Sequence, residues 1–124
     1  MDFRNGNELL ELCKQEDCLI SQVMRRRECE LGEIAPDRVE AKMARALEIM
    51  RESATQPLKH PVRSMGGLIG GEAKHLAAHA AKKKSLCGPV LQRAITYAMG
   101  VLEVNASMGL IVAAPTAGSS GVVP

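Results

Sequence analysis

Residues 36–55, PDRVEAKMARALEIMRESAT, are the stretch that decides the fold class. Their apolar members recur at helical steps of three and four and so form one stripe along a helix. Pro36 suits a first helical position, and Asp37 favours the positive end of the helix dipole. The pattern predicts one helix over residues 36–55, with a stripe made of Val39, Met43, Ala46, Leu47, Met50 and Ala54.

The segments on both sides also have helical patterns. Residues 8–31 favour helix in two pieces, the second of which stops before Gly32. Further helices are expected over residues 72–83 and over residues 89–108, where Pro89 provides a start. Aromatic residues make up only 2% of the chain, which disfavours a sandwich or barrel. We therefore expect an all-α domain with Gly-rich loops between its helices, as part of a larger helical catalytic domain.

The composition excludes several classes of function. The chain has 124 residues and a formal net charge of +2, which fits one soluble domain and gives no basic surface for nucleic acid. Only Phe3 and Tyr97 are aromatic, so stacking on single-stranded nucleic acid is excluded as well. No apolar run reaches the roughly 18–20 residues of a membrane span, and the first residues lack the pattern of a signal peptide. We expect a cytoplasmic protein that binds neither nucleic acid nor membrane.

The charge is distributed unevenly along the chain. From residue 94 to residue 124 the only charged side chain is Glu103. Such a stretch is expected to be buried, either in the core of this chain or against a partner, and a homo-oligomer would provide such a partner. Glu103, Asn105 and Ser107 lie within five residues of one another in this apolar run. Buried polar groups cost free energy when they lack partners, so these should bond to each other or to a ligand.

Two Gly-rich segments are candidate ligand-binding loops. Residues 64–72, SMGGLIGGE, hold four glycines in six positions, which permits a close approach between backbone amides and a ligand. Residues 114–121, APTAGSSG, offer amides and hydroxyls to an anion such as a carboxylate. Neither segment has the spacing of a dinucleotide or nucleotide-phosphate loop. On spacing alone, both segments are also compatible with linkers.

Two motifs resemble those of the iron–sulfur-dependent L-serine dehydratases, specifically the α chain or α domain. They are EVNASMG at residues 103–109 and PTAGSSGVVP at residues 115–124, and GGEAK at 70–74 and SLCGP at 85–89 support them. The resemblance covers nearly the whole chain and implies deamination of L-serine to pyruvate and ammonia. It also implies a [4Fe–4S] cluster that acts as a Lewis acid on the substrate hydroxyl, and a β chain or β domain as partner.

The resemblance further implies that the cluster cysteines come after Pro124, because the α chain of this family is longer. We expect residues 1–124 to be the N-terminal part of the α-chain catalytic domain, truncated at residue 124. The cysteines of this chain follow no paired spacing, so we expect reduced thiols and no metal ligand among Cys13, Cys18, Cys29 and Cys87.

The expected substrate site combines both Gly-rich segments with the end of the last long helix. Ser64, Gly66 and Gly67 are expected to bind the serine carboxylate, and Lys74 adds positive charge. The residues expected to line the same pocket are Asn105, Thr116, Gly118 and Ser119. No residue is an evident catalytic base, and none is assigned.

Two other functions are compatible with parts of the sequence. A pyridoxal-phosphate amino acid dehydratase would use a lysine to hold the cofactor and GSSG at 118–121 to hold its phosphate, but the alternating βα pattern of such folds is absent. A non-enzymatic helical interaction module would use the amphipathic first half, with the Gly-rich segments as mere linkers. Sequence beyond Pro124 that contains several cysteines would favour the cluster enzyme.

Overall fold

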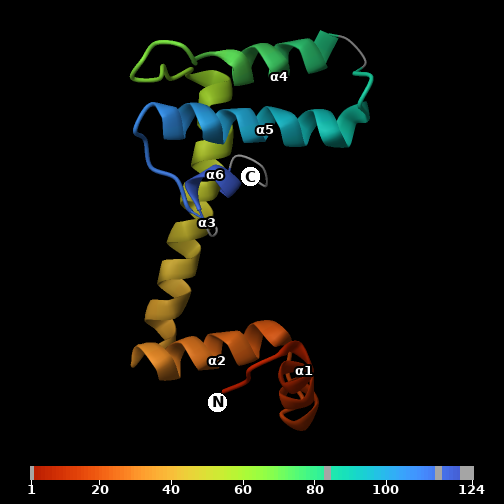
Figure 1. Cartoon of the computed structure of the whole chain (residues 1–124), viewed down its shortest axis with the longest axis vertical. Helices are drawn as coiled ribbons and strands as arrows, with labels where there is room; N and C mark the ends of the chain where they lie inside the picture. The colour runs from red at the N-terminus through yellow and green to blue at the C-terminus, as the bar shows by residue number, and fades with distance from the viewer. Residues whose placement is uncertain (1, 83–84, 114–115, 121–124) are drawn as a thin grey trace. The chain divides into compact units, whose positions relative to one another are not determined.

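The computed structural model describes residues 2–82, 85–113 and 116–120, and no strand occurs among them. The expected all-α fold class is therefore confirmed. Residues 83, 114, 115 and 121–124 of the segments singled out above lie outside the described residues. The helices are α1 (Gly6–Gln15), α2 (Ile20–Gly32), α3 (Pro36–Lys59), α4 (Glu72–Lys82), α5 (Gly88–Ala106) and α6 (Ala117–Ser120) (Figure 1).

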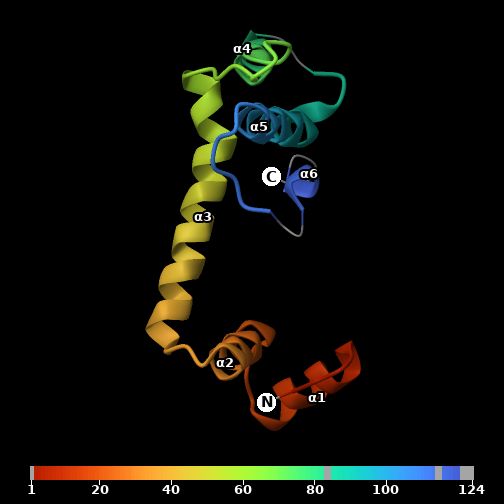
Figure 2. The same ribbon diagram turned by 60° about the vertical axis from the view of Figure 1, so that its left-hand side comes forward.

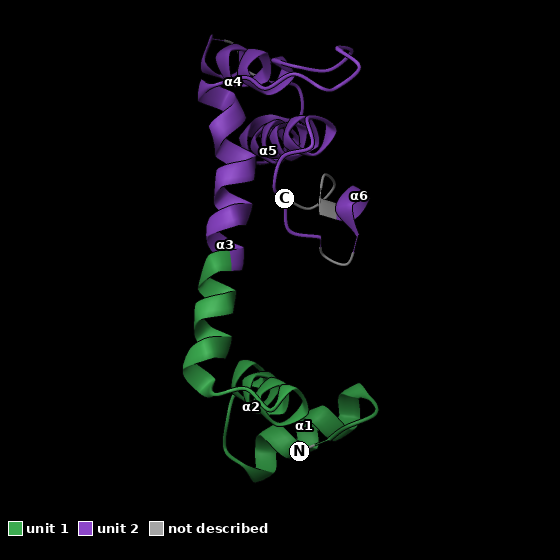
Figure 3. Ribbon diagram, turned by 90° about the vertical axis from the view of Figure 1, so that its left-hand side faces the viewer, with its two compact units in different colours: residues 1–45 green, residues 46–124 purple. Residues whose placement is uncertain are grey.

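Contacts divide the chain into two compact units. The first unit comprises residues 1–45 and the second comprises residues 46–124, so the boundary falls within α3 (Figure 3). The first unit holds α1, α2 and the start of α3. The second holds the rest of α3 with α4, α5 and α6. It also contains the two Gly-rich segments, whose glycines are all described except Gly121.

In the first unit, α1 and α2 are separate helices because the chain turns sharply between them. Asp17 adopts a left-handed conformation with a φ of 47°. The N–H of Cys18 then donates to the carbonyl of Cys13, which closes the end of α1. Helix α1 packs against α2. The core of this unit contains Val23, which is completely buried, and Val39.

Three consecutive arginines on α2 pair with acidic residues of the same unit. The pairs are Arg25 with Glu40 at 2.7 Å, Arg26 with Glu16 at 3.2 Å and Arg27 with Asp2 at 3.5 Å. The guanidinium of Arg27 also lies 4.7 Å from the ring centroid of Phe3. Since the paired side chains are largely exposed, each ion pair contributes at most about 1 kcal/mol to stability. The basic triplet thus has partners within the chain.

In the second unit, α4 and α5 lie side by side, and the last turns of α3 pack against them (Figure 2). Helix α3 continues to Lys59, whereas the sequence pattern ended at residue 55. Pro57 lies inside the helix and lacks the N–H that would complete a helical hydrogen bond. Its side chain is among the largest that are fully buried, and this packing offsets the lost bond.

Helix α5 buries one face within this chain and exposes the other. Its buried residues are Thr96, Gly100, Val101, Glu103 and Val104. On the exposed face, Val90 is 78% exposed and Leu91 is 51% exposed. The apolar stripe of α3 is likewise only partly buried, because Ala54 is buried while Met43 and Leu47 are exposed.

No helix of the described residues is long and apolar enough to cross a membrane.

Candidate functional site

The Gly-rich segment between α3 and α4 folds into a hydrogen-bonded turn. The N–H of Ser64 donates to the carbonyl of Ile69 at 2.8 Å, and the N–H of Ile69 donates to Ser64 Oγ at 3.1 Å. The N–H of Gly67 donates to the carbonyl of Ser64 at 2.9 Å. We call residues 64–71 the Gly-rich loop. Ser64 closes this loop with both its backbone and its side chain.

Two glycines of the loop are required by its geometry. Gly67 has a φ of 71°, in the left-handed region that other residues avoid. Gly70 lies so near the preceding chain that an added Cβ would stand 2.8 Å from the carbonyl oxygen of Val62 and 3.0 Å from Arg63 Cα. The loop therefore has one defined conformation that depends on its glycines.

The loop is attached to the end of α5, so the structure brings part of the expected site together. The N–H of Met65 donates to the carbonyl of Ala106, the last residue of α5, at 3.2 Å. Figure 1 shows the loop and the end of α5 at the same end of the second unit. Asn105 is half-buried at this junction, and its side chain forms no hydrogen bond with the described residues. The N–H groups of Gly66 and Leu68 likewise find no acceptor there.

The other expected site residues lie on α4 and at the start of α6. Lys74 is in the first turn of α4 with its side chain exposed. Ser119 Oγ donates to the carbonyl of Thr116 at 2.8 Å, and the N–H of Ser119 donates to Thr116 Oγ1 at 3.3 Å. Gly118 lies in the same turn, where an added Cβ would meet nothing within 4 Å. These hydroxyls cap α6, which packs against α5.

A buried carboxyl beneath the loop was not assigned a role from the sequence. Glu103 on α5 is 0% exposed, and its Oε1 accepts a hydrogen bond of 2.7 Å from the N–H of Ala73 on α4. Its Oε2 is also buried and has no hydrogen-bond partner among the described residues. One feature of the sequence does point to Glu103: it is the only charged residue between residues 94 and 124.

A second carboxyl lies beside it at the start of α4. Glu72 Oε2 accepts a hydrogen bond of 2.7 Å from the N–H of Gly70 in the loop. Hydrogen bonds from its own backbone N–H and from that of Gly70 lower the pKa of the Glu72 carboxyl. The side chain of Glu103 and the charge of His75 lower the same pKa by smaller amounts. These hydrogen bonds and charges favour the ionised form of the Glu72 carboxyl.

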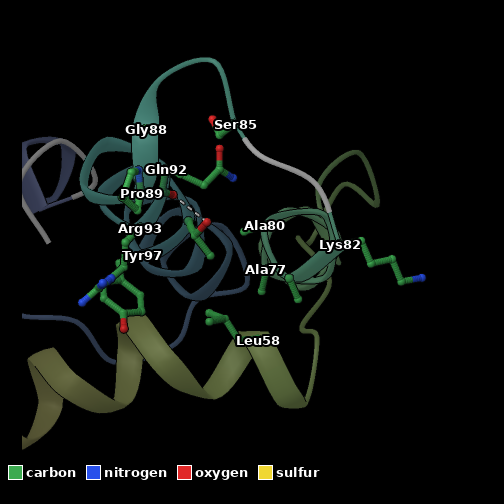
Figure 4. Close-up of a pocket in the computed structure, with 12 residues that line it drawn as sticks. Leu58, Ala77, Ala80, Lys82, Ser85, Gly88, Pro89, Gln92, Arg93 and Tyr97 are labelled. Carbon is green, nitrogen blue, oxygen red and sulfur yellow. Dashed lines mark hydrogen bonds between the residues drawn. The ribbon is translucent and has the colours of Figure 1, made fainter.

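A groove of about 900 Å³ lies among α3, α4 and α5 (Figure 4). Its walls include Leu58, Ala77, Gln92, Arg93 and Tyr97. None of the residues expected to bind substrate is among the described residues that line it. The groove and the Gly-rich loop are thus different features of the second unit.

The described residues do not form a site for an iron–sulfur cluster. Cys13, Cys18 and Cys29 belong to the first unit, whereas Cys87 belongs to the second, directly before α5. All four are free thiols. In the described parts of the chain, no three or more His, Cys, Asp or Glu side chains are grouped to hold a metal ion. A cluster needs about four thiolates around one centre, and the described residues do not bring four together.

Comparison with known proteins identifies the family. The family model for the serine dehydratase alpha chain matches residues 15–124. The chain belongs to this family. The resemblance seen in its motifs is thereby confirmed over most of the sequence. No solved structure matches the chain.

Curated relatives of the serine dehydratase alpha chain family match almost the whole chain. It is 44% identical over 122 residues to the probable L-serine dehydratase alpha chain of Bacillus subtilis, covering 98% of this chain and 40% of that protein. It is 34% identical over 122 residues to the L-serine dehydratase alpha chain of Peptoniphilus asaccharolyticus, with 98% and 42% covered. A third relative, the L-serine dehydratase of Streptomyces coelicolor, is 29% identical over 126 residues and is covered to 27%. The chain thus spans less than half the length of these relatives.

Proposed function

We propose that this chain is part of an enzyme that deaminates L-serine to pyruvate and ammonia, and that its Gly-rich loop binds the serine carboxylate. One observation carries the proposal: the N–H of Met65 donates to the carbonyl of Ala106, which joins the Gly-rich loop to α5 directly after Asn105. The N–H groups of Gly66 and Leu68 in this loop find no acceptor among the described residues. This arrangement occurs in a chain whose relatives are named L-serine dehydratases.

Carboxylate binding follows from the donors that the loop leaves free. The N–H groups of Gly66 and Leu68 are held in place by the bonds between Ser64 and Ile69, so binding needs little reorganisation. Ser64 Oγ accepts from Ile69, and its own hydrogen therefore remains available to the substrate. Lys74 in the first turn of α4 adds a positive charge to the region.

The reaction removes the Cα proton and the β-hydroxyl of serine as water and leaves 2-aminoacrylate. Its imine tautomer takes up water and releases ammonia, which gives pyruvate. We propose that Asn105 donates a hydrogen bond to the departing hydroxyl. We also propose that Thr116, Gly118 and Ser119 line the pocket in which the Gly-rich loop binds serine. A fixed donor that bonds more strongly as negative charge develops lowers the barrier of such a step.

The proposal also includes a cofactor and a partner for the enzyme. We propose that the enzyme uses a [4Fe–4S] cluster whose ligands lie outside the described residues of this chain. We propose that the chain is the N-terminal part of the α-chain catalytic domain and that its partner is a β chain or β domain. A surface of the kind a partner covers is present on α5, where the exposed apolar side chains include Val90, Leu91, Ile95 and Leu102.

The test is pyruvate formation from L-serine by the complete enzyme, purified without oxygen. Ser64→Ala removes the hydroxyl that closes the loop and is expected to raise KM for serine by about 10-fold or more. Ser21→Ala is the matched control, since Ser21 is exposed in the first turn of α2, in the other unit. An enzyme that forms no pyruvate from serine, or a Ser64 variant that matches the Ser21 variant, contradicts the proposal.

A further inference from the structure

The first turn of α4 has no capping side chain of its own. The carbonyl of Gly71 accepts the first helical hydrogen bond, from the N–H of His75 at 3.1 Å, so Gly71 occupies the N-cap position. An N-cap side chain normally accepts a hydrogen bond from the N–H two or three residues further on, and glycine has no side chain to do so. Because Ala73 is 0% exposed, its N–H needs an acceptor from elsewhere in the fold.

Glu103 supplies this acceptor from α5. Its Oε1 accepts a hydrogen bond of 2.7 Å from the N–H of Ala73, and the whole Glu103 residue is buried. Its other oxygen, Oε2, has no hydrogen-bond partner among the described residues. The contribution of this carboxyl to the described packing is therefore a cap for α4 that comes from a neighbouring helix.

The same turn of α5 also binds the beginning of the Gly-rich loop. The N–H of Met65 donates to the carbonyl of Ala106 at 3.2 Å, which pairs one of the carbonyls that a helix leaves free at its C-terminus. Glu103 and Ala106 are three residues apart and so lie in one helical turn, with Asn105 between them in the sequence. The chain is thus bound to this turn at Met65, near the start of the loop, and again at Ala73, just after its end.

We propose that Glu103 is a positioning residue for the Gly-rich loop: by capping α4, its Oε1 fixes the end of the loop to the turn of α5 that carries Asn105. Without this acceptor, the bond from Met65 would be the remaining hydrogen bond between this segment and α5 among the described residues. The N–H groups of Gly66 and Leu68 could then move relative to Asn105. The consequence for serine binding rests on the function proposed above.

The test compares three substitutions at Glu103 in the full chain. Glu103→Gln keeps an acceptor oxygen at the same distance along the side chain, Glu103→Leu keeps a similar volume without an acceptor, and Glu103→Asp keeps a carboxyl but withdraws it by one methylene group. Amide hydrogen exchange at Met65, Ile69 and Ala73 is expected to accelerate by about 10- to 100-fold in the Leu and Asp variants and to stay close to the original rate in the Gln variant.

Two controls separate this effect from general destabilisation. Amides in the middle of α5 report on unfolding of the whole second unit, and their exchange is expected to change much less than that of the loop. Glu52→Leu removes an exposed carboxyl from the part of α3 that belongs to the same unit, and it is expected to leave the exchange of the loop unchanged.

Retained protection of the loop in either the Leu or the Asp variant would overturn the proposal. An equal loss of protection in the Gln variant would also overturn it, because Gln retains the acceptor for Ala73. If the Leu variant does not fold, which would appear as lost protection along the whole of α5, the comparison of the Asp and Gln variants decides the same question.

Kinetics of the complete enzyme test the consequence for serine binding. The Leu and Asp variants are expected to raise KM for serine by about 10- to 100-fold with a smaller change in kcat, and the Gln variant is expected to keep KM near its original value. A Gln variant with a protected loop but a strongly lowered kcat would show that the carboxyl takes part in the reaction, and the positioning role would be wrong. If the unmodified enzyme does not turn over serine, the proposed function fails, whereas the exchange data still decide whether Glu103 positions the loop.

Discussion

Gly100 on α5 lies against the backbone of Ala54 on α3, and a Cβ on Gly100 would stand 2.7 Å from the carbonyl oxygen of Ala54. This close approach belongs to the buried face of α5, which also contains Glu103. A change in the spacing of the two helices would therefore move the helix that carries Glu103. The contact links the packing of the second unit to the position of the Gly-rich loop.

Gly100→Ala is expected to destabilise the protein. Alanine gains roughly 1 kcal/mol in helix propensity over glycine, but overpacking against a backbone carbonyl costs about 1–3 kcal/mol. Because the carbonyl of Ala54 is part of a helix, it cannot move aside as a flexible side chain would. Urea unfolding measures the difference in free energy. Gly6→Ala in α1 is the control, since an added Cβ there meets nothing within 4 Å; equal behaviour of the two variants would contradict the packing argument.

Glu72→Gln is expected to lower stability at neutral pH and to have less effect in acid. The folded-state pKa of Glu72 lies below the ordinary value of 4.5 because backbone N–H groups bond to its carboxylate. Its contribution is therefore present above that ordinary value and is lost as the pH falls through the lowered folded-state pKa. Thermal unfolding of both proteins between about pH 7 and pH 3 should show converging melting temperatures. A gap that stays constant would show that ionisation of Glu72 is irrelevant to stability.

The sequence predicted where the long helices form but not which of their faces are buried. The stripe from Val39 to Ala54 correctly indicated a helix, yet only its ends are buried in the described structure, where other helices meet them. Periodicity records which face is apolar, whereas burial depends on a partner surface. Pro57 shows the same limit, because local rules favour a helix end there and tertiary packing overrides them.

The candidate site could also be predicted only in part, because local sequence patterns do not show long-range contacts. The glycines and the amide of Asn105 were recognisable from local pattern and from the resemblance to a family. The bond between Glu103 and Ala73 joins residues 30 positions apart, and no local pattern indicates such a pair. The sequence showed that Glu103 needed a partner, and only the fold showed which one.

Replacing the four cysteines by serine, one at a time, is expected to leave the iron and sulfide content of the complete enzyme unchanged. The described thiols are divided between the two units, and no group of metal-binding side chains forms around them. Iron and acid-labile sulfide are measured after reconstitution without oxygen. A variant that loses about one cluster per enzyme while keeping its melting temperature would identify a ligand and refute the proposed origin of the cluster ligands.

Asn105→Ala is expected to lower kcat/KM for serine by roughly 10²-fold while changing the melting temperature little. The side chain of Asn105 has no hydrogen-bond partner among the described residues, so its removal breaks no bond there. If it donates to the departing hydroxyl, the loss appears in the kinetics because the bond strengthens as charge develops. Steady-state kinetics and thermal unfolding on the same preparation separate the two effects, with Asn7→Ala on exposed α1 as the control. Near-normal kcat/KM would remove Asn105 from the site, and a lowered melting temperature with intact kinetics would assign it to the core.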